Sequence, residues 1–167
     1  TQAIGAEKRD ESGTAVFDPK GRRNLALGMP VVYSSNIYAF TGDKAVDGDI
    51  SSYWEGAANS YPNSLTVDLV SSKRLEAAVL KLNPKQVWGA RRQRIETFVS
   101  EDGQDFRSLV PDRDYLFDPL ANGNSAAIEL GVEARYLRFV VSGNSDATAG
   151  QIAALEDYGA GKERNVP

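Results

Sequence analysis

The side chains that could do chemistry in this chain are oxygen donors and aromatic rings, because the sequence contains no histidine and no cysteine. Without histidine there is no imidazole base and no Ser-His or Cys-His nucleophile. Without cysteine there is no thiolate, disulfide or iron–sulfur cluster. Carboxylates, tyrosines, lysines and oxygen-ligated sites for a hard cation such as calcium remain. The composition therefore excludes the commonest catalytic constellations.

An acidic loop at residues 43–52 is the first candidate site. Asp47 and Asp49 stand on either side of Gly48, and Ser52 adds a hydroxyl. The spacing is not that of an EF-hand, because the third position of such a loop carries no ligating side chain here. The oxygens could close around one calcium ion, or the loop could be an Asp-Gly hairpin with solvated acids. The residues alone leave both interpretations open.

Two segments that mix aromatic and polar side chains, residues 53–62 and 86–93, form the second candidate site. They contain Trp54 and Trp88, the two tryptophans of the chain. A flat indole beside planar groups such as that of Arg91 suits a sugar, which presents C–H groups on one face and hydroxyls around its rim. A single tryptophan in a β-sandwich is more often a core residue. Trp88 lies in a polar loop and is harder to explain by burial.

The elements that must position these loops are short β-strands. Apolar residues alternate with polar ones, which is the period of a strand with one buried face. The predicted inward residues are Leu65, Val67 and Leu69; Ala78, Leu80 and Leu82; Ile95, Thr97 and Val99; and Leu137, Phe139 and Val141. A last strand is expected at 151–158, and long loops at 34–45, 51–62, 84–93 and 142–150. Short strands separated by Asp-Gly and Asn-Gly turns predict an antiparallel β-sandwich with its binding groups on loops.

Length and charge limit the organisation of the chain and its partners. The 167 residues correspond to one domain. We expect a lead-in or linker at residues 1–23 with at most one short strand, the domain at 24–160 and a tail at 161–167. The 23 acidic residues outnumber the 19 basic ones, so the net charge of -4 does not favour nucleic acid or anionic lipid as partners. No apolar run is long enough to span a membrane.

Seven segments follow one another in a characteristic order, at residues 24–28, 44–49, 53–54, 65–69, 100–106, 134–138 and 152–159. In this order they resemble the discoidin or coagulation-factor type C domain, and most closely the branch classed as family 32 carbohydrate-binding modules. The resemblance covers about residues 24–159. It implies an all-β fold, a galactose-binding-like jelly-roll β-sandwich of about eight antiparallel strands.

The resemblance also implies a structural calcium ion that joins the first and last strands. Six residues occupy the positions of its ligands: Lys44, Asp49 and Leu155 through their carbonyls, Asp47 and Glu156 through their carboxylates, and Ser52 through its carbonyl and hydroxyl. Ser52 stands where threonine is more usual and keeps the hydroxyl. The ion would be a structural cofactor and not a catalyst.

The resemblance implies less about the sugar. Galactose-binding members often place a histidine in the site, and this chain has none. A glucan-type oligo- or polysaccharide is therefore favoured over plain galactose. The expected contacts are Trp88 as stacking platform, Arg91 and Glu55 as hydroxyl clamps, Tyr61, Tyr38 and Asn144 as flanking groups, and Trp54 as a further candidate.

The function that follows is that of a non-catalytic, monomeric carbohydrate-binding module. We expect it to be secreted or extracellular, as part of a bacterial enzyme that acts on polysaccharide and uses the module to stay at its substrate. A discoidin-type adhesion or membrane-binding domain is the alternative, but the loops are acidic and the net charge is negative. An enzyme with a pair of carboxylates is a third hypothesis, which no predicted cleft supports.

Overall fold

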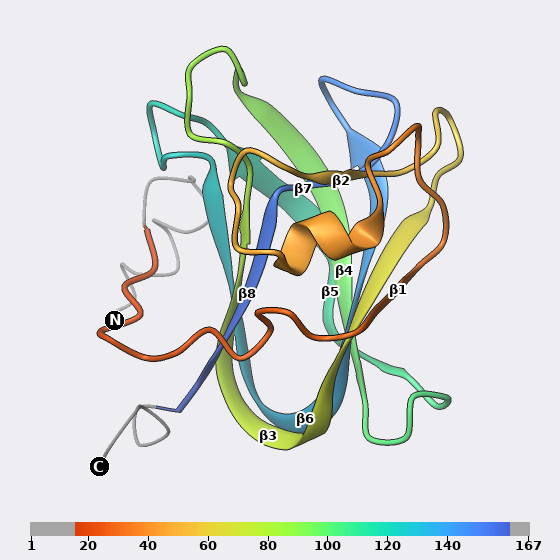
Figure 1. The fold of residues 1–167 in the computed structure, drawn as a ribbon, viewed down its shortest axis with the longest axis vertical. Helices are drawn as coiled ribbons and strands as arrows, with labels where there is room; N and C mark the ends of the chain where they lie inside the picture. The colour runs from red at the N-terminus through yellow and green to blue at the C-terminus, as the bar shows by residue number, and fades with distance from the viewer. Residues whose placement is uncertain (1–15, 161–167) are drawn as a thin grey trace.

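Two long strands, β3 (Asn63–Lys81) and β6 (Ser125–Asn144), organise the computed structural model, which describes residues 16–160. They pair antiparallel over most of their length, with shifts in register between Asp68 and Lys73 and between Leu75 and Ala77. Figure 1 shows both strands bending sharply at the lower end of the molecule. Each strand therefore contributes one half to each of two facing layers.

The other strands extend these two layers. β1 (Val31–Tyr33) and β8 (Ala154–Gly159) pair with the first and second halves of β3, respectively. β4 (Arg91–Ser100) pairs with the second half of β6, and β5 (Arg107–Phe117) forms the edge beyond it. The short strands β2 (Trp54–Glu55) and β7 (Gln151–Ile152) pair with each other. Residues 16–160 thus hold eight strands, and the predicted antiparallel all-β sandwich is confirmed.

The core lies between the two layers and is formed by the alternating residues that the sequence pattern singled out. All twelve predicted inward residues are buried: Leu65, Val67, Leu69, Ala78, Leu80, Leu82, Ile95, Thr97, Val99, Leu137, Phe139 and Val141. Asp157 differs from these core residues because it is acidic. It is fully buried, and its two carboxylate oxygens have no hydrogen-bond partner. Burial, and then the nearby Glu156 carboxylate, raises the pKa of Asp157 to about 8. The folded core therefore holds this carboxyl mostly neutral at neutral pH.

The strand prediction differs from the structure in several details, since β1 and β5 were not predicted and β2 lies in the predicted loop at 51–62. The runs at 64–69 and 75–82 belong to one bent strand, β3, instead of two. The expected last strand is divided into β7 and β8 at Ala153. A 3-10 helix, η1 (Gly42–Val46), occupies part of a predicted loop. No helix within residues 16–160 is long and apolar enough to cross a membrane.

Part of the expected lead-in lies against the sandwich. Residues 1–15 and the tail at 161–167 are outside the described part of the chain, and residues 16–23 contain no strand. The Phe17 ring stacks on Tyr158 of β8 with 5.4 Å between ring centroids. Arg22 donates to the carbonyl of Gly159 at 2.7 Å and pairs with Glu76. Residues 17–22 therefore cover the outer face of β8.

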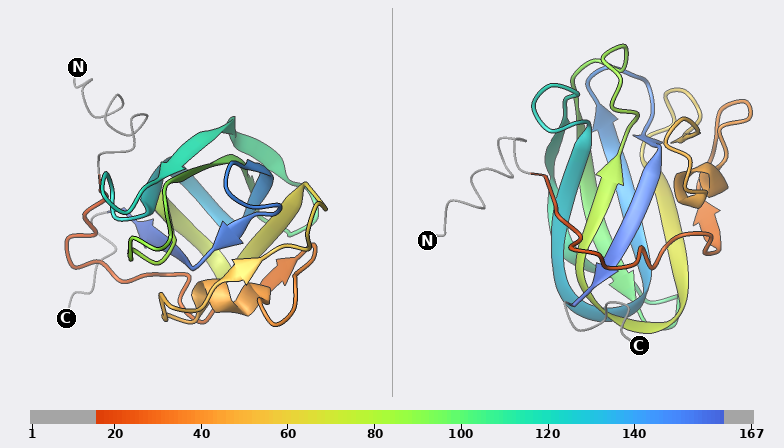
Figure 2. Two further views of the ribbon diagram at one scale, coloured as in Figure 1. Left: turned by 90° about the horizontal axis from the view of Figure 1, so that it is seen from above. Right: turned by 60° about the vertical axis from the view of Figure 1, so that its left-hand side comes forward.

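The long loops gather at one end of the sandwich, opposite the bends of β3 and β6 (Figures 1 and 2). Backbone hydrogen bonds join them, from Gly56 N to Gly150 O at 3.1 Å and from Ser145 N to Arg92 O at 2.9 Å. Gly150 has no space for a side chain, because a Cβ there would lie 2.8 Å from Cβ of Val141. This close approach seats the 145–150 loop on the core.

Candidate functional site

The Arg91 side chain lies at the centre of the loop end and is 6% exposed. Its Nη1 donates to Gln151 Oε1 at 2.6 Å, and its Nη2 lies 3.1 Å from Asp146 Oδ2. Nε and Nη2 both donate to the carbonyl of Gly89 at 3.2 Å. Every guanidinium nitrogen is thus engaged within the protein. Arg91 positions the loops, and the geometry does not support its predicted part as a clamp for sugar hydroxyls.

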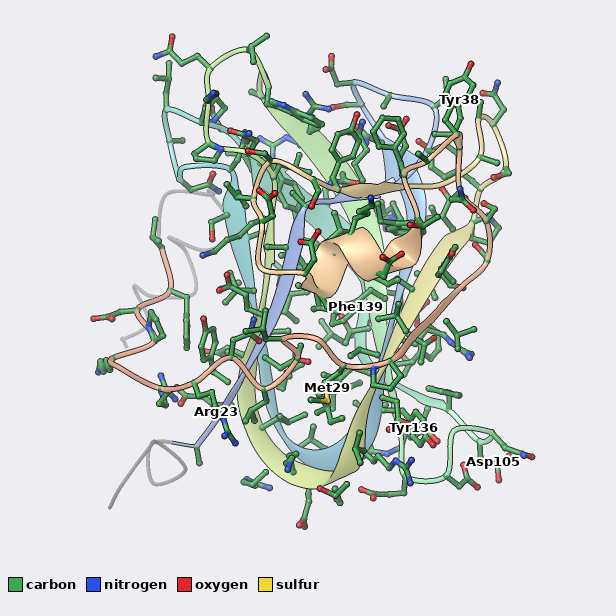
Figure 3. The ribbon with its side chains drawn as sticks, in the orientation of Figure 1. Arg23, Met29, Tyr38, Asp105, Tyr136 and Phe139 are labelled. Atoms are coloured by element: carbon green, nitrogen blue, oxygen red, sulfur yellow. The ribbon has the colours of Figure 1, made fainter. Side chains whose placement is uncertain are left out.

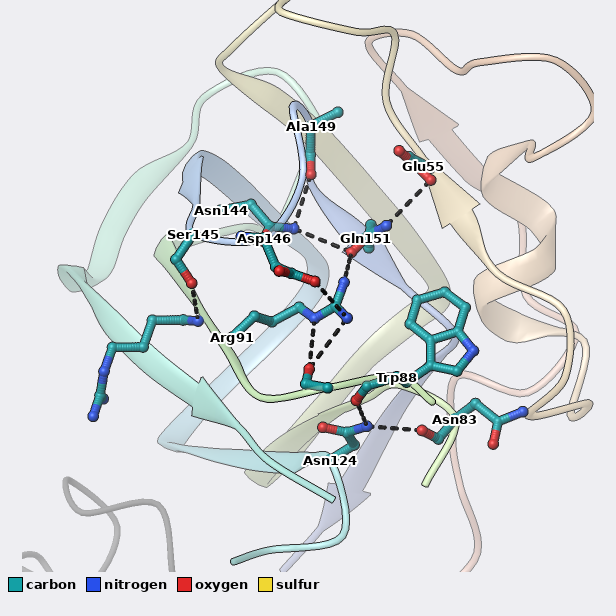
Figure 4. Close-up of polar contacts among 12 residues, drawn as sticks. Glu55, Asn83, Trp88, Arg91, Asn124, Asn144, Ser145, Asp146, Ala149 and Gln151 are labelled. Carbon is teal, nitrogen blue, oxygen red and sulfur yellow. Dashed lines mark hydrogen bonds and ion pairs between the residues drawn. The ribbon is translucent and has the colours of Figure 1, made fainter. Parts of the chain in front are cut away.

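Gln151 carries this network on to Glu55 (Figure 4). Its Nε2 donates to Glu55 Oε1 at 3.2 Å. Asn144 Nδ2 donates to Gln151 Oε1 at 3.2 Å and to the carbonyl of Ala149 at 3.0 Å. The buried Gln93 side chain fixes the Gln151 backbone, with hydrogen bonds of 2.9 and 3.0 Å. Asp146, Arg91, Gln151 and Glu55 therefore form one connected set of polar groups from β2, β4, β7 and the 145–150 loop.

Aromatic rings lie beside this polar set. Trp88 is half-buried, and its ring meets Tyr53 edge-on at 4.8 Å between centroids. Tyr53 stacks in turn on Phe40 at 4.5 Å. The Arg91 Cζ lies 5.2 Å from the centroid of the Trp88 ring. The indole is held in place by its neighbours while part of it stays accessible, so its predicted part as a stacking platform remains a prediction.

The Glu55 carboxylate lies close enough to two tyrosines to affect them. Burial raises the pKa of Tyr53, Glu55 raises it further, and Arg91 acts in the opposite direction. Burial raises the pKa of Tyr61 in the same way, again followed by Glu55. The Tyr61 hydroxyl donates to the carbonyl of Ala147 at 3.1 Å. The Glu55 carboxylate thus lies within electrostatic reach of both tyrosines.

Two of the predicted sugar contacts, Trp54 and Tyr38, lie at opposite extremes of exposure. Trp54 is fully buried, and its Nε1 donates to the carbonyl of Ser35 at 3.0 Å, so it is a core residue that no surface ligand reaches. Its assignment to the sugar site is wrong. Tyr38 is 86% exposed on the rim, and its neighbour Ile37 bonds the Glu55 carbonyl at 3.0 Å. Figure 3 shows Tyr38 at the outermost corner of the loop end.

The sequence reasoning missed three residues of the site, Tyr53, Asp146 and Gln151. Tyr53 precedes Trp54 in a motif that carried the resemblance, and Asp146 is the one acid in the 142–150 loop. Both signals were available. Gln151 begins the predicted last strand, and nothing in its local sequence distinguishes it from a solvent-facing glutamine. Only the pairing of β7 with β2 brings it to Glu55.

The acidic loop brings several oxygens together. Asp47 Oδ1 accepts from the backbone N of Asp49 at 2.9 Å. The Ser52 hydroxyl lies 2.5 Å from Asp47 Oδ2 and 3.0 Å from the Asp49 carbonyl. Lys44 belongs to the part of this loop that forms η1. A carboxylate, a hydroxyl and a carbonyl that converge in this way fit the preference of calcium for oxygen ligands.

The two predicted ligands from the last strand are arranged less favourably. Glu156 Oε2 lies 3.1 Å from Lys81 Nζ, and its Oε1 accepts from the Tyr158 hydroxyl at 2.8 Å. Leu155 is fully buried and pairs with Leu80 of β3. Within residues 16–160 no three acidic side chains form a group that could hold a metal ion. The loop oxygens therefore fit a calcium ion, whereas the Glu156 carboxylate is already neutralised by a lysine.

The sequence profile of the F5/8 type C domain matches residues 31–155. The chain belongs to the F5/8 type C domain family. Among proteins with curated descriptions, none matches this F5/8 type C domain.

Solved structures of the same fold include whole enzymes and isolated modules. A family 89 glycoside hydrolase from Clostridium perfringens has a TM-score of 0.67 and 25% identity over 86% of this F5/8 type C domain, which spans only 15% of that chain. A chitosan-binding module from a Paenibacillus chitosanase/glucanase matches with a TM-score of 0.65 and 20% identity, covering 82% of this chain and 99% of that one. A pectin-binding carbohydrate-binding module matches with a TM-score of 0.66 and 17% identity, covering 83% of this chain and 93% of that one. The proteins that match over nearly their whole length are thus accessory carbohydrate-binding modules and not catalytic domains.

Proposed function

We propose that this F5/8 type C domain is a non-catalytic carbohydrate-binding module that holds a secreted, polysaccharide-active enzyme at its glycan substrate. The observation that carries the proposal is an accessible indole, Trp88, at the loop end that shares the neighbour Tyr53 with an accessible carboxylate, Glu55. Flat apolar surface beside oriented polar groups is the chemistry that a pyranose needs. This domain matches only 15% of the length of a glycoside hydrolase, which supports the proposal that it is an accessory module of a larger enzyme.

Each residue of the site has a different part in binding the sugar. Trp88 offers its accessible surface to the C–H face of a sugar ring, and Glu55 accepts hydrogen bonds from hydroxyls. Tyr61 and Tyr38 flank the ligand from the neighbouring loops, and Asn144 shapes the loop that carries Asp146. One stacked ring and a few hydrogen bonds give a weak interaction, with a dissociation constant of about 10⁻⁵–10⁻³ M. We propose a glucan-type ligand in preference to plain galactose.

Titration of the domain with gluco- and galacto-oligosaccharides tests this proposal. Trp88→Ala should abolish measurable binding because it removes the stacking surface. Phe106→Ala is the matched control, since Phe106 is also a partly buried aromatic with an arginine over its ring, at 3.8 Å from Arg138 Cζ. It lies in the 101–106 loop at the opposite end of the molecule. Failure of every oligosaccharide to bind would refute the proposal.

We also propose a structural calcium ion at the acidic loop. The Asp47 carboxylate, the Ser52 hydroxyl and carbonyl, and the Lys44 and Asp49 carbonyls would hold it. The carbonyl of Leu155 is the remaining backbone candidate, and Glu156 would join only by leaving Lys81. The convergence of loop oxygens around Ser52 supports this assignment. The ion would fix the loop to the sandwich without taking part in any reaction.

Thermal unfolding with calcium or with chelator tests the ion. Calcium at a hundred times its dissociation constant should stabilise the fold by about 2.7 kcal/mol. Asp47→Ala should remove that gain, and Asp43→Ala should keep it, because the Asp43 carboxylate is bonded to the Thr41 hydroxyl instead. Lys81→Met should tighten calcium binding if Glu156 is a ligand. An unchanged unfolding temperature on adding calcium would contradict the site.

A further inference from the structure

The hydrogen-bonding groups of the loop end are unequally divided between donors and acceptors. Each of the three Arg91 guanidinium nitrogens donates to a protein oxygen. The Gln151 side chain accepts from Arg91 and Asn144 and donates to Glu55. By contrast, among the described residues no hydrogen bond engages Glu55 Oε2 or Asp146 Oδ1. The side-chain oxygens of this network that accept no hydrogen bond are thus carboxylate oxygens.

The charges in the network leave an excess of negative charge at Glu55. Arg91 is the one cation within the connected set, and its closest carboxylate is that of Asp146 at 3.1 Å. Arg92, the next residue along β4, is on the opposite side of the strand and is exposed. Within the described part of the chain, the Glu55 carboxylate accepts a hydrogen bond only from the neutral side-chain amide of Gln151. Its charge is thus available to a cationic ligand.

The rings around Glu55 favour the same kind of ligand. The carboxylate is close enough to Tyr53 and Tyr61 to raise the pKa of both hydroxyls. Trp88 lies beyond Tyr53 at 4.8 Å between ring centroids. A cation is attracted both by a carboxylate and by the faces of aromatic rings. A ligand that places a positive charge at Glu55 and an apolar ring face at Trp88 satisfies the whole arrangement.

We propose that the sugar recognised here carries an ammonium group, as a glucosamine unit does, with that group at Glu55 and the pyranose ring against Trp88. This inference rests on the proposed function and adds a charge requirement to it. An N-acetylglucosamine unit keeps the ring but lacks the charge. A uronic acid unit brings a like charge to Glu55 and is disfavoured.

The experiment compares tetrasaccharides of glucosamine, N-acetylglucosamine, glucose and galacturonic acid by isothermal titration at a pH where the amine is protonated. We expect the glucosamine tetramer to bind at least tenfold more tightly than the N-acetylated one and the galacturonate to bind most weakly. Glu55→Gln keeps the shape of the side chain and removes its charge. It should erase most of the tenfold preference, measured as the ratio of the affinities for the glucosamine and N-acetylglucosamine tetramers.

Glu133→Gln is the matched control, because Glu133 is an exposed glutamate near the bend of β6, far from the loops. It should preserve the tenfold preference. Equal losses in the two variants would assign the preference to overall charge and overturn the inference. Equal affinity for glucosamine and N-acetylglucosamine tetramers, or tighter binding of the latter, would also overturn it and leave carbohydrate binding intact. Failure of all four tetramers to bind would refute the proposed function as well.

Discussion

Arg91 and Arg92 show how different two adjacent arginines can be. Strand alternation predicts that one faces the interior and the other faces solvent, and the structure confirms this. The sequence could not tell which one turns inward. It also could not show that Gly89, Gln151 and Asp146 engage all three guanidinium nitrogens of Arg91, since Gln151 and Asp146 are far from Arg91 in the chain.

Replacing each arginine in turn compares the contribution to stability of the buried Arg91 side chain with that of the solvated Arg92 side chain. Arg91→Ala should lower the free energy of unfolding by about 2 kcal/mol, because the Gly89 carbonyl and the Gln151 amide lose their partner. Arg92→Ala should change it by less than about 0.5 kcal/mol. Urea denaturation measures both. Equal effects would mean that the Arg91 network does not support the loops.

The ion pair of Asp68 with Arg135 predicts a dependence of stability on pH. Arg135 Nε and Nη2 lie 2.7 and 3.0 Å from the two Asp68 oxygens. Hydrogen bonds from Arg135 hold the pKa of Asp68 below its ordinary value. Because the folded pKa is the lower one, Asp68 stabilises the fold above its unfolded pKa of about 3.9, and the gain disappears as the pH falls through the folded value.

Asp68→Asn should therefore destabilise the protein by about 1 kcal/mol at neutral pH, the upper end for a pair that solvent reaches. The difference from the parent protein should shrink as the pH falls below about 4, where the aspartate itself becomes protonated. Chemical denaturation at a series of pH values gives both curves. A difference that stays constant from neutral pH to acid would exclude the charge of Asp68 as its cause.

At the level of the elements, the bend of β3 explains what the sequence prediction missed. Residues 70–72 are exposed and interrupt the alternation, so the pattern indicates a turn between two strands. The backbone nevertheless continues as one strand, because β6 bends beside it and pairs with both halves. Local pattern gives the faces of a strand but not the length over which a distant partner keeps pairing. The division at Ala153 has the same origin, since β7 and β8 pair with different strands.

Gly150 tests how closely the 145–150 loop must approach β6. Gly150→Ala places a Cβ 2.8 Å from Cβ of Val141, which is fully buried and cannot move away. We expect a loss of about 1–3 kcal/mol in unfolding free energy, together with weaker sugar binding. Gly143→Ala is the control, since its Cβ would meet only Arg94 Cβ, at an ordinary 3.8 Å. Two variants of equal stability would show that the loop tolerates displacement.

For the whole molecule, seven short segments in order were enough to predict the family and the sandwich. They were not enough to place residues 16–23, whose few apolar side chains have no period. Phe17 and Arg22 find their partners only on the finished outer surface of β8 and β3. The predicted boundary at residue 24 follows the family pattern, whereas the packed part of the chain begins earlier.

Replacement of Arg22 tests how much residues 16–23 contribute to the stability of the fold. Arg22→Ala removes hydrogen bonds to the Gly159 and Pro19 carbonyls and the ion pair with Glu76, so the free energy of unfolding should fall by about 1–2 kcal/mol. Arg23→Ala makes the same change of charge at an exposed neighbour and should have almost no effect. Thermal unfolding of the three proteins gives the comparison. Identical unfolding temperatures would show that the segment is not part of the stable unit.

The network that runs from Asp146 through Arg91 and Gln151 to Glu55 exists before any sugar arrives, so little ordering has to accompany binding. Association can then proceed at an ordinary rate of about 10⁶ M⁻¹s⁻¹. With a dissociation constant of about 10⁻⁴ M, each encounter lasts roughly 10 ms. In the proposed function, a residence time so short would let the module release one stretch of a polymer and capture the next, which would keep an attached enzyme on its substrate without halting it.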